Sequence, residues 1–288
     1  MSHLVSDNAV LGGFRIAHGK HGKGNPVVLI HGTPSSSLIW RNIVPALVDG
    51  GHQVHLYDLL GYGRSERPWN PAVDTSVTAQ VPVLEALLDH WGLKQIDLVA
   101  HDIGGAVAQR FALSHPDQVR SLTLIDSVSF DSWPSARTRQ QMAAGLEALI
   151  KAPDEDHRQD FRQWILSTVH DPARLAAESL ERYLDYISGP LGQASFFQHQ
   201  VRHYDPRHTA ELSDRLHELG RLPVQIIWGE QDAWQSVDWA YRLQAAIPGA
   251  RLQVLPDCGH FAMEDKPEEI SALLIDFIAR SRMVEGAA

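Results

Sequence analysis

The chain has 288 residues, 44% of them hydrophobic and 21% charged, with a formal net charge of −10 at pH 7, values typical of a globular protein with a sizeable core. The negative charge argues against a nucleic-acid partner, because such binding needs clustered positive charge. The single cysteine excludes an intramolecular disulfide, residues 1–20 contain no apolar signal-peptide core and no apolar run is long enough for a membrane span, so we expect a cytoplasmic protein without a membrane partner.

Short apolar runs, rich in β-branched residues, alternate with helical patterns along the chain. Their near-continuous hydrophobicity indicates strands buried on both faces, as in a mostly parallel sheet flanked by helices. Strands are predicted at 26–31, 53–58, 96–101, 121–126, 224–229 and 251–256, and helices near 38–49, 76–91, 104–115, 237–247 and 267–282.

Residues 132–215 interrupt this alternation. The segment is helix-like, rich in Arg, His and Gln, and contains no convincing strand. Ligands of open α/β sheets bind at the carboxyl edge of the strands, where an inserted helical layer would roof a pocket and exclude water. We therefore expect an α/β core made of residues 1–131 and 216–288, with a helical cap at 132–215.

Three polar residues follow predicted strands. Asp102 follows "IDLVA", Asp232 follows "VQIIWGEQ", and His260 lies in "LPDCGHF" after the last strand. Because carboxyl ends of parallel strands meet at one edge, the three side chains are expected to converge there. Their order of nucleophile, acid and histidine is that of a known hydrolase triad.

Other assignments are open at these positions. Asp102 is equally suited to be an ordinary N-cap of the helix that begins near Gly104. Asp126 ends the strand "SLTLID" and is the alternative triad acid, although "GEQD" favours Asp232. Cys258 is interpreted as a small buried residue. The scattered histidines show no ligand pattern, so neither a metal nor another cofactor is predicted.

Four segments resemble the α/β-hydrolase superfamily across nearly the whole chain: "HGTPSSSLIWRNIVPAL", "YDLLGYGRSERP", "VAHDIGGAVAQRFA" and "GEQDAW…PDCGHFAMEDKPEEI". The "HD-x-GG" elbow is similar to that of the aspartate-nucleophile branch, which contains epoxide hydrolases and haloalkane and haloacetate dehalogenases. The resemblance implies that Asp102 is the nucleophile and that the backbone N–H groups of Thr33 and Ile103 form an oxyanion hole. His31, in the same "HGTP" motif, is a candidate substrate contact.

An aspartate suits displacement at saturated carbon. Its carboxylate is ionised at neutral pH and needs no base to activate it. The product is an alkyl-enzyme ester, and the water that hydrolyses this ester does need a base, for which His260 oriented by Asp232 is the candidate.

The leaving group separates the candidate reactions. An epoxide oxygen leaves as an alkoxide and calls for a neutral O–H donor, and the candidates in the cap are Tyr183, Tyr186, His199, His203 and Tyr204. Haloalkane dehalogenases typically carry a Trp directly after the nucleophile and an Asn in the "HG-N-P" motif, where this chain has Ile103 and Thr33. Trp133 and Trp164 nevertheless remain candidate halide donors.

The sequence therefore predicts a monomeric or homodimeric epoxide hydrolase that uses water to convert a small apolar epoxide into a diol. The alternatives are a haloalkane or haloacid dehalogenase with the same covalent mechanism, a catalytically silent α/β-hydrolase that binds a small molecule, and a non-hydrolytic relative in which Asp102 acts as a base.

Overall fold

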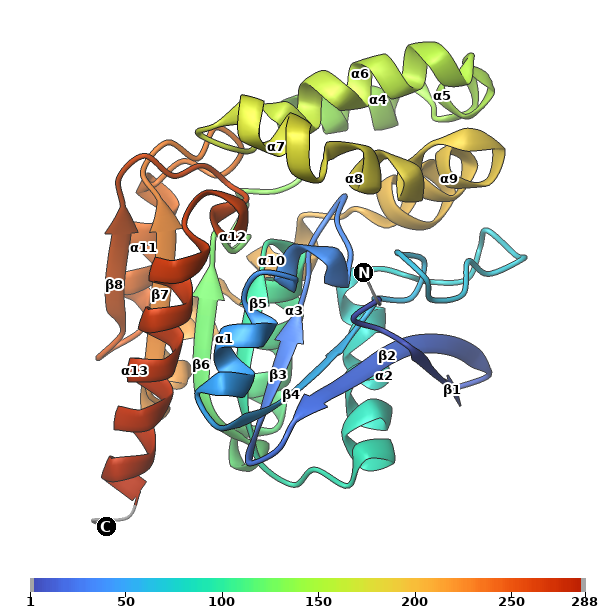
Figure 1. The fold of residues 1–288 in the computed structure, drawn as a ribbon. Helices are drawn as coiled ribbons and strands as arrows, with labels where there is room; N and C mark the ends of the chain where they lie inside the picture. Colours follow the sequence, from blue (N-terminus) through green and yellow to red (C-terminus); the bar gives the residue numbers. More distant parts are fainter. Residues whose placement is uncertain (1–2, 286–288) are drawn as a thin grey trace.

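A single eight-stranded sheet runs through the computed structural model, which describes residues 3–285 (Figure 1). The strand order is β1-β2-β4-β3-β5-β6-β7-β8. The six strands from β3 to β8 are parallel, and the β1–β2 hairpin adds two antiparallel strands at the β4 edge. The strands are β1 (Asp7–Leu11), β2 (Phe14–Gly22), β3 (Asn25–Ile30), β4 (His52–Tyr57), β5 (Ile96–His101), β6 (Val119–Ile125), β7 (Val224–Gly229) and β8 (Arg251–Leu255).

The six parallel strands are those that the apolar runs predict, displaced by at most two residues at either end. Every residue of β5 and of β7 is buried, as expected for strands covered on both faces. The β1–β2 hairpin was not predicted. Most of β1 is exposed, so it lacks an apolar run, and its turn at Gly12 and Gly13 uses positive φ angles of 57° and 88°, which glycine adopts without strain.

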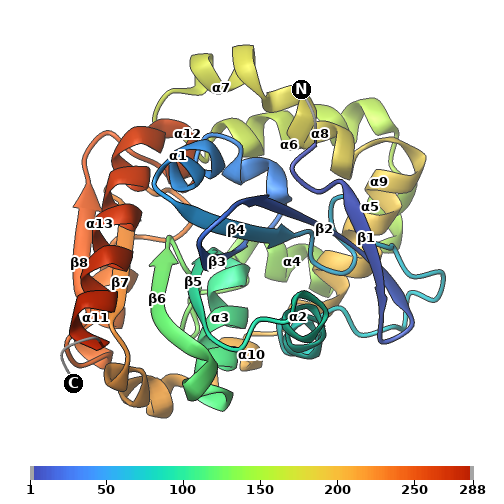
Figure 2. The same cartoon turned by 60° about the horizontal axis from the view of Figure 1, so that its bottom comes forward.

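Helices cover both faces of the sheet (Figures 1 and 2). Helices α1 (Val44–Asp49) and α13 (Pro267–Glu285) pack on one face, while α2 (Val77–Trp91), α3 (Ile103–Ser114) and α11 (Asp238–Ala246) lie on the other. The helix predicted over 38–49 is divided into a 3-10 turn, η1 (Ser37–Trp40), and α1. Pro45 stands in the first turn of α1, where its missing N–H leaves no helical hydrogen bond unmade.

Between β6 and β7 the described chain forms helices and turns and no strand. Six of these helices, named the cap helices, lie across the carboxyl ends of the parallel strands (Figure 1). They are α4 (Ala136–Ala144), α5 (Glu147–Lys151), α6 (Asp154–Leu166), α7 (Pro172–Glu178), α8 (Leu180–Ile187) and α9 (Gly189–Ser195). The turns η3 (Phe196–Gln200), η4 (Val201–His203), α10 (Arg207–Ala210) and η5 (Ser213–Arg221) lead back to the core, and α12 (Ala262–Asp265) precedes α13. We retain 132–215 as the proposed limits of a cap.

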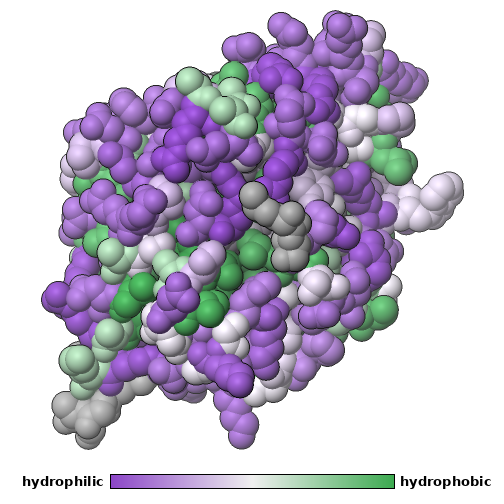
Figure 3. All heavy atoms as spheres, viewed as in Figure 1, coloured by the Kyte–Doolittle hydropathy of each residue, from purple (hydrophilic) through white to green (hydrophobic). Residues whose placement is uncertain are grey.

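The face shown in Figure 3 is mainly hydrophilic, with hydrophobic residues gathered near its centre. The large apolar side chains are otherwise concentrated between the sheet and its helices, where Trp40, Tyr57 and Trp228 are fully buried. Within the described part of the chain, no helix combines the length and apolar character needed to cross a membrane.

Candidate active site

Asp102 stands at a sharp turn between β5 and α3. Its backbone has φ 53° and ψ −124°, a conformation that costs free energy in a non-glycine residue and is concentrated at functional sites. A Cβ atom at Gly104 would overlap the carbonyl oxygen of His31, and one at Gly105 would overlap the Ser127 hydroxyl. Only glycine therefore lets α3 approach this closely. The Asp102 side chain makes no capping hydrogen bond to α3, which removes the N-cap interpretation.

The two oxygens of the Asp102 carboxylate have different surroundings. Oδ1 accepts a hydrogen bond of 2.7 Å from the backbone N–H of Thr33, and Oδ2 lies 3.5 Å from Nε2 of His260. Gly32 makes room for the carboxylate, because a Cβ there would overlap it. Ile103 is buried as the first residue of α3, at the helix end where N–H groups lack helical partners.

His260 is oriented by Asp232. Its Nδ1–H donates to Oδ2 of Asp232 at 2.8 Å, so the Nε2 atom faces Asp102. The other oxygen of Asp232 accepts the backbone N–H groups of Trp234 at 2.7 Å and Gln235 at 2.8 Å. The Asp232 carboxylate is therefore fixed from both sides, and the ring orientation of His260 follows from it.

The charges around His260 outweigh its burial. Burial lowers the pKa of the imidazole, but the side chains of Asp232 and Asp102 raise it by more. The net result is a pKa well above the ordinary 6.5. In the free protein the two neighbouring aspartates thus favour the imidazolium form of His260. Removing the charge of either carboxylate would lower the pKa of His260.

Asp126, the alternative acid, is not the hydrogen-bond partner of His260. It is fully buried at the end of β6, and its Oδ1 accepts the backbone N–H of Gly229 at 2.8 Å. Within residues 3–285 its Oδ2 has no hydrogen-bond partner. Burial, with the nearby negative charge of Asp232, raises the pKa of Asp126 well above its usual range, which favours the neutral carboxylic acid.

Two residues near His260 were missed by the sequence analysis. The Nε2–H of His101 donates to the carbonyl oxygen of His260 at 2.9 Å, and burial lowers the pKa of His101 to about 3. Trp234 stacks on the His260 ring with centroids 5.3 Å apart, and Trp164 of α6 stacks on Trp234 at 4.2 Å. The "HD" pair and the "DAW" segment placed both residues beside triad positions, but sequence alone does not indicate ring packing.

A cavity of about 270 Å³ opens beside the Asp102 carboxylate, between the core and the cap helices. Its volume lies just under the range usual for sites of drug-sized ligands, so it suits a compact substrate. Among the predicted substrate contacts it includes Trp133 and Tyr204. Its lining residues are Thr33, Asp102, Trp133, Ser135, Arg137, Thr138, Trp164, Ser167, Tyr204, Ala233, Trp234 and Gln235.

Tyr204 provides a neutral hydroxyl in this cavity. Its OH is in a short hydrogen bond with Oγ1 of Thr33, whose own backbone N–H donates to Asp102. The Thr33 hydroxyl also donates to Gln200 at 3.2 Å, and in the bond that it shares with Tyr204 either oxygen can be the donor. Burial, with a contribution from Asp102, raises the pKa of Tyr204, so its hydroxyl remains protonated.

Five candidate substrate contacts, His31, Tyr183, Tyr186, His199 and His203, do not line this cavity. His31 is fully buried, its Nδ1–H donates to the carbonyl of Gly32 and its Nε2 accepts the N–H of Leu59, so it supports the turn before Thr33. Tyr183 donates to Glu264 beneath the cap helices.

Tyr186 lines a different cavity. His199 is buried against Gly61, and burial lowers its pKa to about 4. The sequence places these residues in the expected cap segment, but it does not tell which side of a helix faces the active site.

No group of three or more His, Cys, Asp or Glu side chains in the described residues is arranged to hold a metal ion. Cys258 is buried, and burial raises the pKa of its thiol, so it lacks the thiolate character of a nucleophile.

A family model described as alpha/beta hydrolase fold matches residues 25–267, and the chain belongs to this family. It is 26% identical over 97% of its length, and 88% of the relative, to a cis-3-alkyl-4-alkyloxetan-2-one decarboxylase of Shewanella oneidensis. It is also 28% identical to a 2-hydroxy-6-oxo-6-phenylhexa-2,4-dienoate hydrolase of Comamonas testosteroni, over 93% of this chain and 92% of the relative.

Solved structures give the same fold. An alpha/beta hydrolase fold protein from Burkholderia ambifaria has a TM-score of 0.87 and 34% identity, covering 96% of this chain and 98% of that one. The epoxide hydrolase CorEH, solved without ligand, has a TM-score of 0.80 and 25% identity over 95% of this chain and 98% of its own.

Proposed function

We propose that the protein is an epoxide hydrolase in which Asp102 attacks a ring carbon and His260 activates the water that releases the product. The observation that carries the proposal is that the two oxygens of the Asp102 carboxylate have different partners. Oδ1 is held by the Thr33 N–H at 2.7 Å, while Oδ2 lies 3.5 Å from Nε2 of His260 and, within the described residues, accepts no backbone N–H. Oδ2 is thus the nucleophile, and Oδ1 becomes the carbonyl oxygen of the ester already placed in an oxyanion hole.

Tyr204 is the proton donor to the leaving oxygen. When Oδ2 forms its bond to the carbon, the ring C–O bond breaks and the oxygen takes a proton from the Tyr204 hydroxyl. An alkoxide is strongly basic, so a neutral O–H donor at this position lowers the barrier to ring opening. A weakly basic halide gains less from such a donor, which favours an epoxide over a haloalkane.

The pKa of His260 changes in step with the reaction. Formation of the ester removes the negative charge of Asp102, and the pKa of His260 falls because one of the two carboxylates that raise it is gone. The imidazolium then loses its proton, and that proton restores the hydroxyl of the Tyr204 phenolate left by ring opening. His260 becomes a base only after the ester has formed. It takes a proton from water as the water oxygen attacks the ester carbonyl. The bond between the carbonyl carbon and the diol oxygen then breaks, and the leaving oxygen takes the carboxyl proton, which releases the diol and restores the Asp102 carboxylate.

The substrates of the two named relatives bear on the alternatives. Hydrolysis at a ketone, such as the 6-oxo group in the name of the second relative, begins with attack at the carbonyl carbon. An aspartate that attacks there would give an anhydride rather than an alkyl ester. The aspartate at the elbow therefore favours substrates attacked at saturated carbon. An oxetan-2-one qualifies, since it is also a strained oxygen ring.

Ring opening of an oxetan-2-one is accordingly the second candidate, favoured by the similarity to the decarboxylase over 97% of this chain. Attack of Asp102 on its saturated ring carbon would release a carboxylate on the neighbouring carbon. Loss of CO₂ from that carboxylate would form a C=C bond and expel the Asp102 carboxylate unchanged. This route needs no water, so His260 would not be required as a base.

Intact-protein mass spectrometry of the His260→Gln variant separates the candidates. After incubation with styrene oxide, 1-bromobutane and a 3,4-dialkyloxetan-2-one, the epoxide proposal predicts an adduct equal to the whole mass of styrene oxide, located on Asp102 by peptide mapping. The matched control is the Asp102→Asn, His260→Gln double variant, which should remain unmodified. An adduct of bromobutane minus HBr, or continued alkene formation without any adduct, would replace the epoxide proposal.

A further inference from the structure

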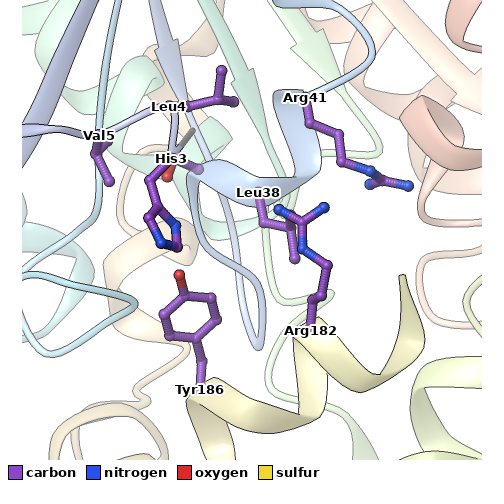
Figure 4. Close-up of a pocket in the computed structure, with 8 residues that line it drawn as sticks. His3, Leu4, Val5, Leu38, Arg41, Arg182 and Tyr186 are labelled. Atoms are coloured by element: carbon purple, nitrogen blue, oxygen red, sulfur yellow. The ribbon is translucent and has the colours of Figure 1, made fainter. Parts of the chain in front are cut away.

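A second cavity, of about 260 Å³, lies between cap helix α8, turn η1 and the N-terminal segment before β1 (Figure 4). It shares no lining residue with the cavity at Asp102. We call it the α8 pocket, and its lining residues are His3, Leu4, Val5, Ser37, Leu38, Arg41, Arg182 and Tyr186. Because its walls come from both the cap helices and the core, a molecule bound there would contact both.

The α8 pocket has a cationic side and an apolar side. Figure 4 shows Arg182 and Tyr186 extending from α8 toward the N-terminal segment and η1, with the Tyr186 hydroxyl directed at His3. Leu4 and Leu38 supply apolar surface on the core side, together with Val5. Such a combination of one charged group and an apolar wall matches ligands with an ionised head and a hydrocarbon body.

Arg182 is an arginine without a carboxylate partner within 4 Å among the residues that the structure describes. The acidic residues beside it on α8, Glu181 and Asp185, are instead paired with arginines of α6: Arg158 contacts both, and Arg162 contacts Glu181. In a chain of net charge −10, acidic groups are abundant, yet this guanidinium is left facing a cavity.

Two carboxylates lie near the pocket, and both already have partners. Glu264 is paired with Arg41 and accepts the Tyr183 hydroxyl. Asp58 accepts the backbone N–H groups of Ser37 and Arg64, each at 2.7 Å. Burial and the charge of Asp58 raise the pKa of the Tyr186 hydroxyl, and the guanidinium groups of Arg64 and Arg182 lower it. Around the pocket the three arginines Arg41, Arg64 and Arg182 thus outnumber the two carboxylates, Glu264 and Asp58.

We propose that the α8 pocket binds a small organic carboxylate with a compact alkyl or aryl body. A guanidinium pairs with a carboxylate through two parallel hydrogen bonds, which assigns the head group to Arg182, with the Tyr186 hydroxyl as a further donor. The hydrocarbon body then rests on Leu4 and Leu38. This ligand site is independent of the reaction proposed for Asp102.

Calorimetric titration of the full chain with phenylacetate tests the proposal, with phenylacetamide and inorganic phosphate as comparison probes. We expect saturable 1:1 binding of phenylacetate, no binding of the neutral amide and weaker binding of phosphate, which has no apolar body. The Arg182→Gln variant should bind phenylacetate about tenfold more weakly or worse, since a charged hydrogen-bonded pair is lost.

The matched control is Arg137→Gln, which removes the arginine of the other cavity and should leave phenylacetate binding unchanged. If Arg182→Gln fails to fold, as judged by its thermal unfolding, Tyr186→Phe provides a milder variant with a smaller loss of affinity. The proposal is wrong if wild type shows no saturable binding, if neither α8 variant weakens it, if Arg137→Gln abolishes it, or if phosphate binds as tightly as phenylacetate.

Discussion

Replacing Asp232 by asparagine is the sharpest test of how His260 works. The new amide side chain has nearly the same shape. Its oxygen can still accept the backbone N–H groups of Trp234 and Gln235, whose nitrogens lie 2.7 and 2.8 Å from Oδ1 of Asp232 in the wild-type protein. Its NH₂ group, however, faces Nδ1 of His260 and is a donor. The imidazole must then carry its proton on Nε2, which leaves no lone pair toward the water beside Asp102.

The expected loss is that of general-base catalysis, about 10²- to 10⁴-fold in the rate of ester hydrolysis, equivalent to about 3–5 kcal/mol of transition-state stabilisation. Rapid-quench measurements with styrene oxide should show ester accumulating to one equivalent per active site, followed by slow diol release. An alanine at position 232 is a poorer choice, since it orphans two buried N–H groups at about 1–3 kcal/mol each.

Asp126→Asn is the matched control. Burial raises the pKa of its carboxyl group, which favours the neutral form, and an amide of the same shape can keep the hydrogen bond from Gly229. We expect turnover close to wild type. Diol formation that survives Asp232→Asn but is lost in Asp126→Asn would refute the assignment of Asp232 and the argument from hydrogen-bond geometry behind it.

Three further predictions follow from the same site. Tyr204→Phe should lower kcat for epoxides about 10²- to 10³-fold, the loss typical of one oxyanion donor, with an unchanged circular dichroism spectrum; activity equal to wild type would exclude Tyr204 as the proton donor. Asp102→Asn should lower the pKa of His260, followed by NMR of its imidazole protons; because the wild-type pKa is raised in the folded state, the associated stability is fully present below pH 6.5 and is lost as pH rises through the folded pKa. Gly104→Ala, whose new Cβ would overlap the backbone carbonyl of His31, should reduce the free energy of unfolding by about 1–3 kcal/mol in urea titrations, and a wild-type midpoint would contradict the close packing of α3.

The parallel strands were predictable because each is a short apolar run in the sequence. A strand such as β5 is buried on both faces, so its sequence is a continuous apolar run between polar turns. The edge hairpin could not be found in this way. Strand β1 buries little of its surface and is stabilised by pairing with β2, a long-range contact that leaves no comparable pattern in the sequence.

The sequence by itself determined the family resemblance and the three residues at the strand ends, Asp102, Asp232 and His260, because parallel strands bring their carboxyl ends to one edge whatever the loops between them do. It favoured Asp232 through the "GEQD" pattern but left Asp126 open, since both follow strands at that edge. In the tertiary structure the turn after β7 brings Asp232 within 2.8 Å of His260, while Asp126 bonds to Gly229 instead.

The cap residues show the same limit. Tyr183, Tyr186 and Tyr204 are equally plausible oxygen donors in sequence, but only Tyr204 among them lines the cavity at Asp102. Which face of a cap helix points toward the core depends on how the whole layer packs, and that is set by contacts between residues far apart in the chain. Local patterns therefore fix where the chemistry is located, and tertiary packing decides which side chains take part in it.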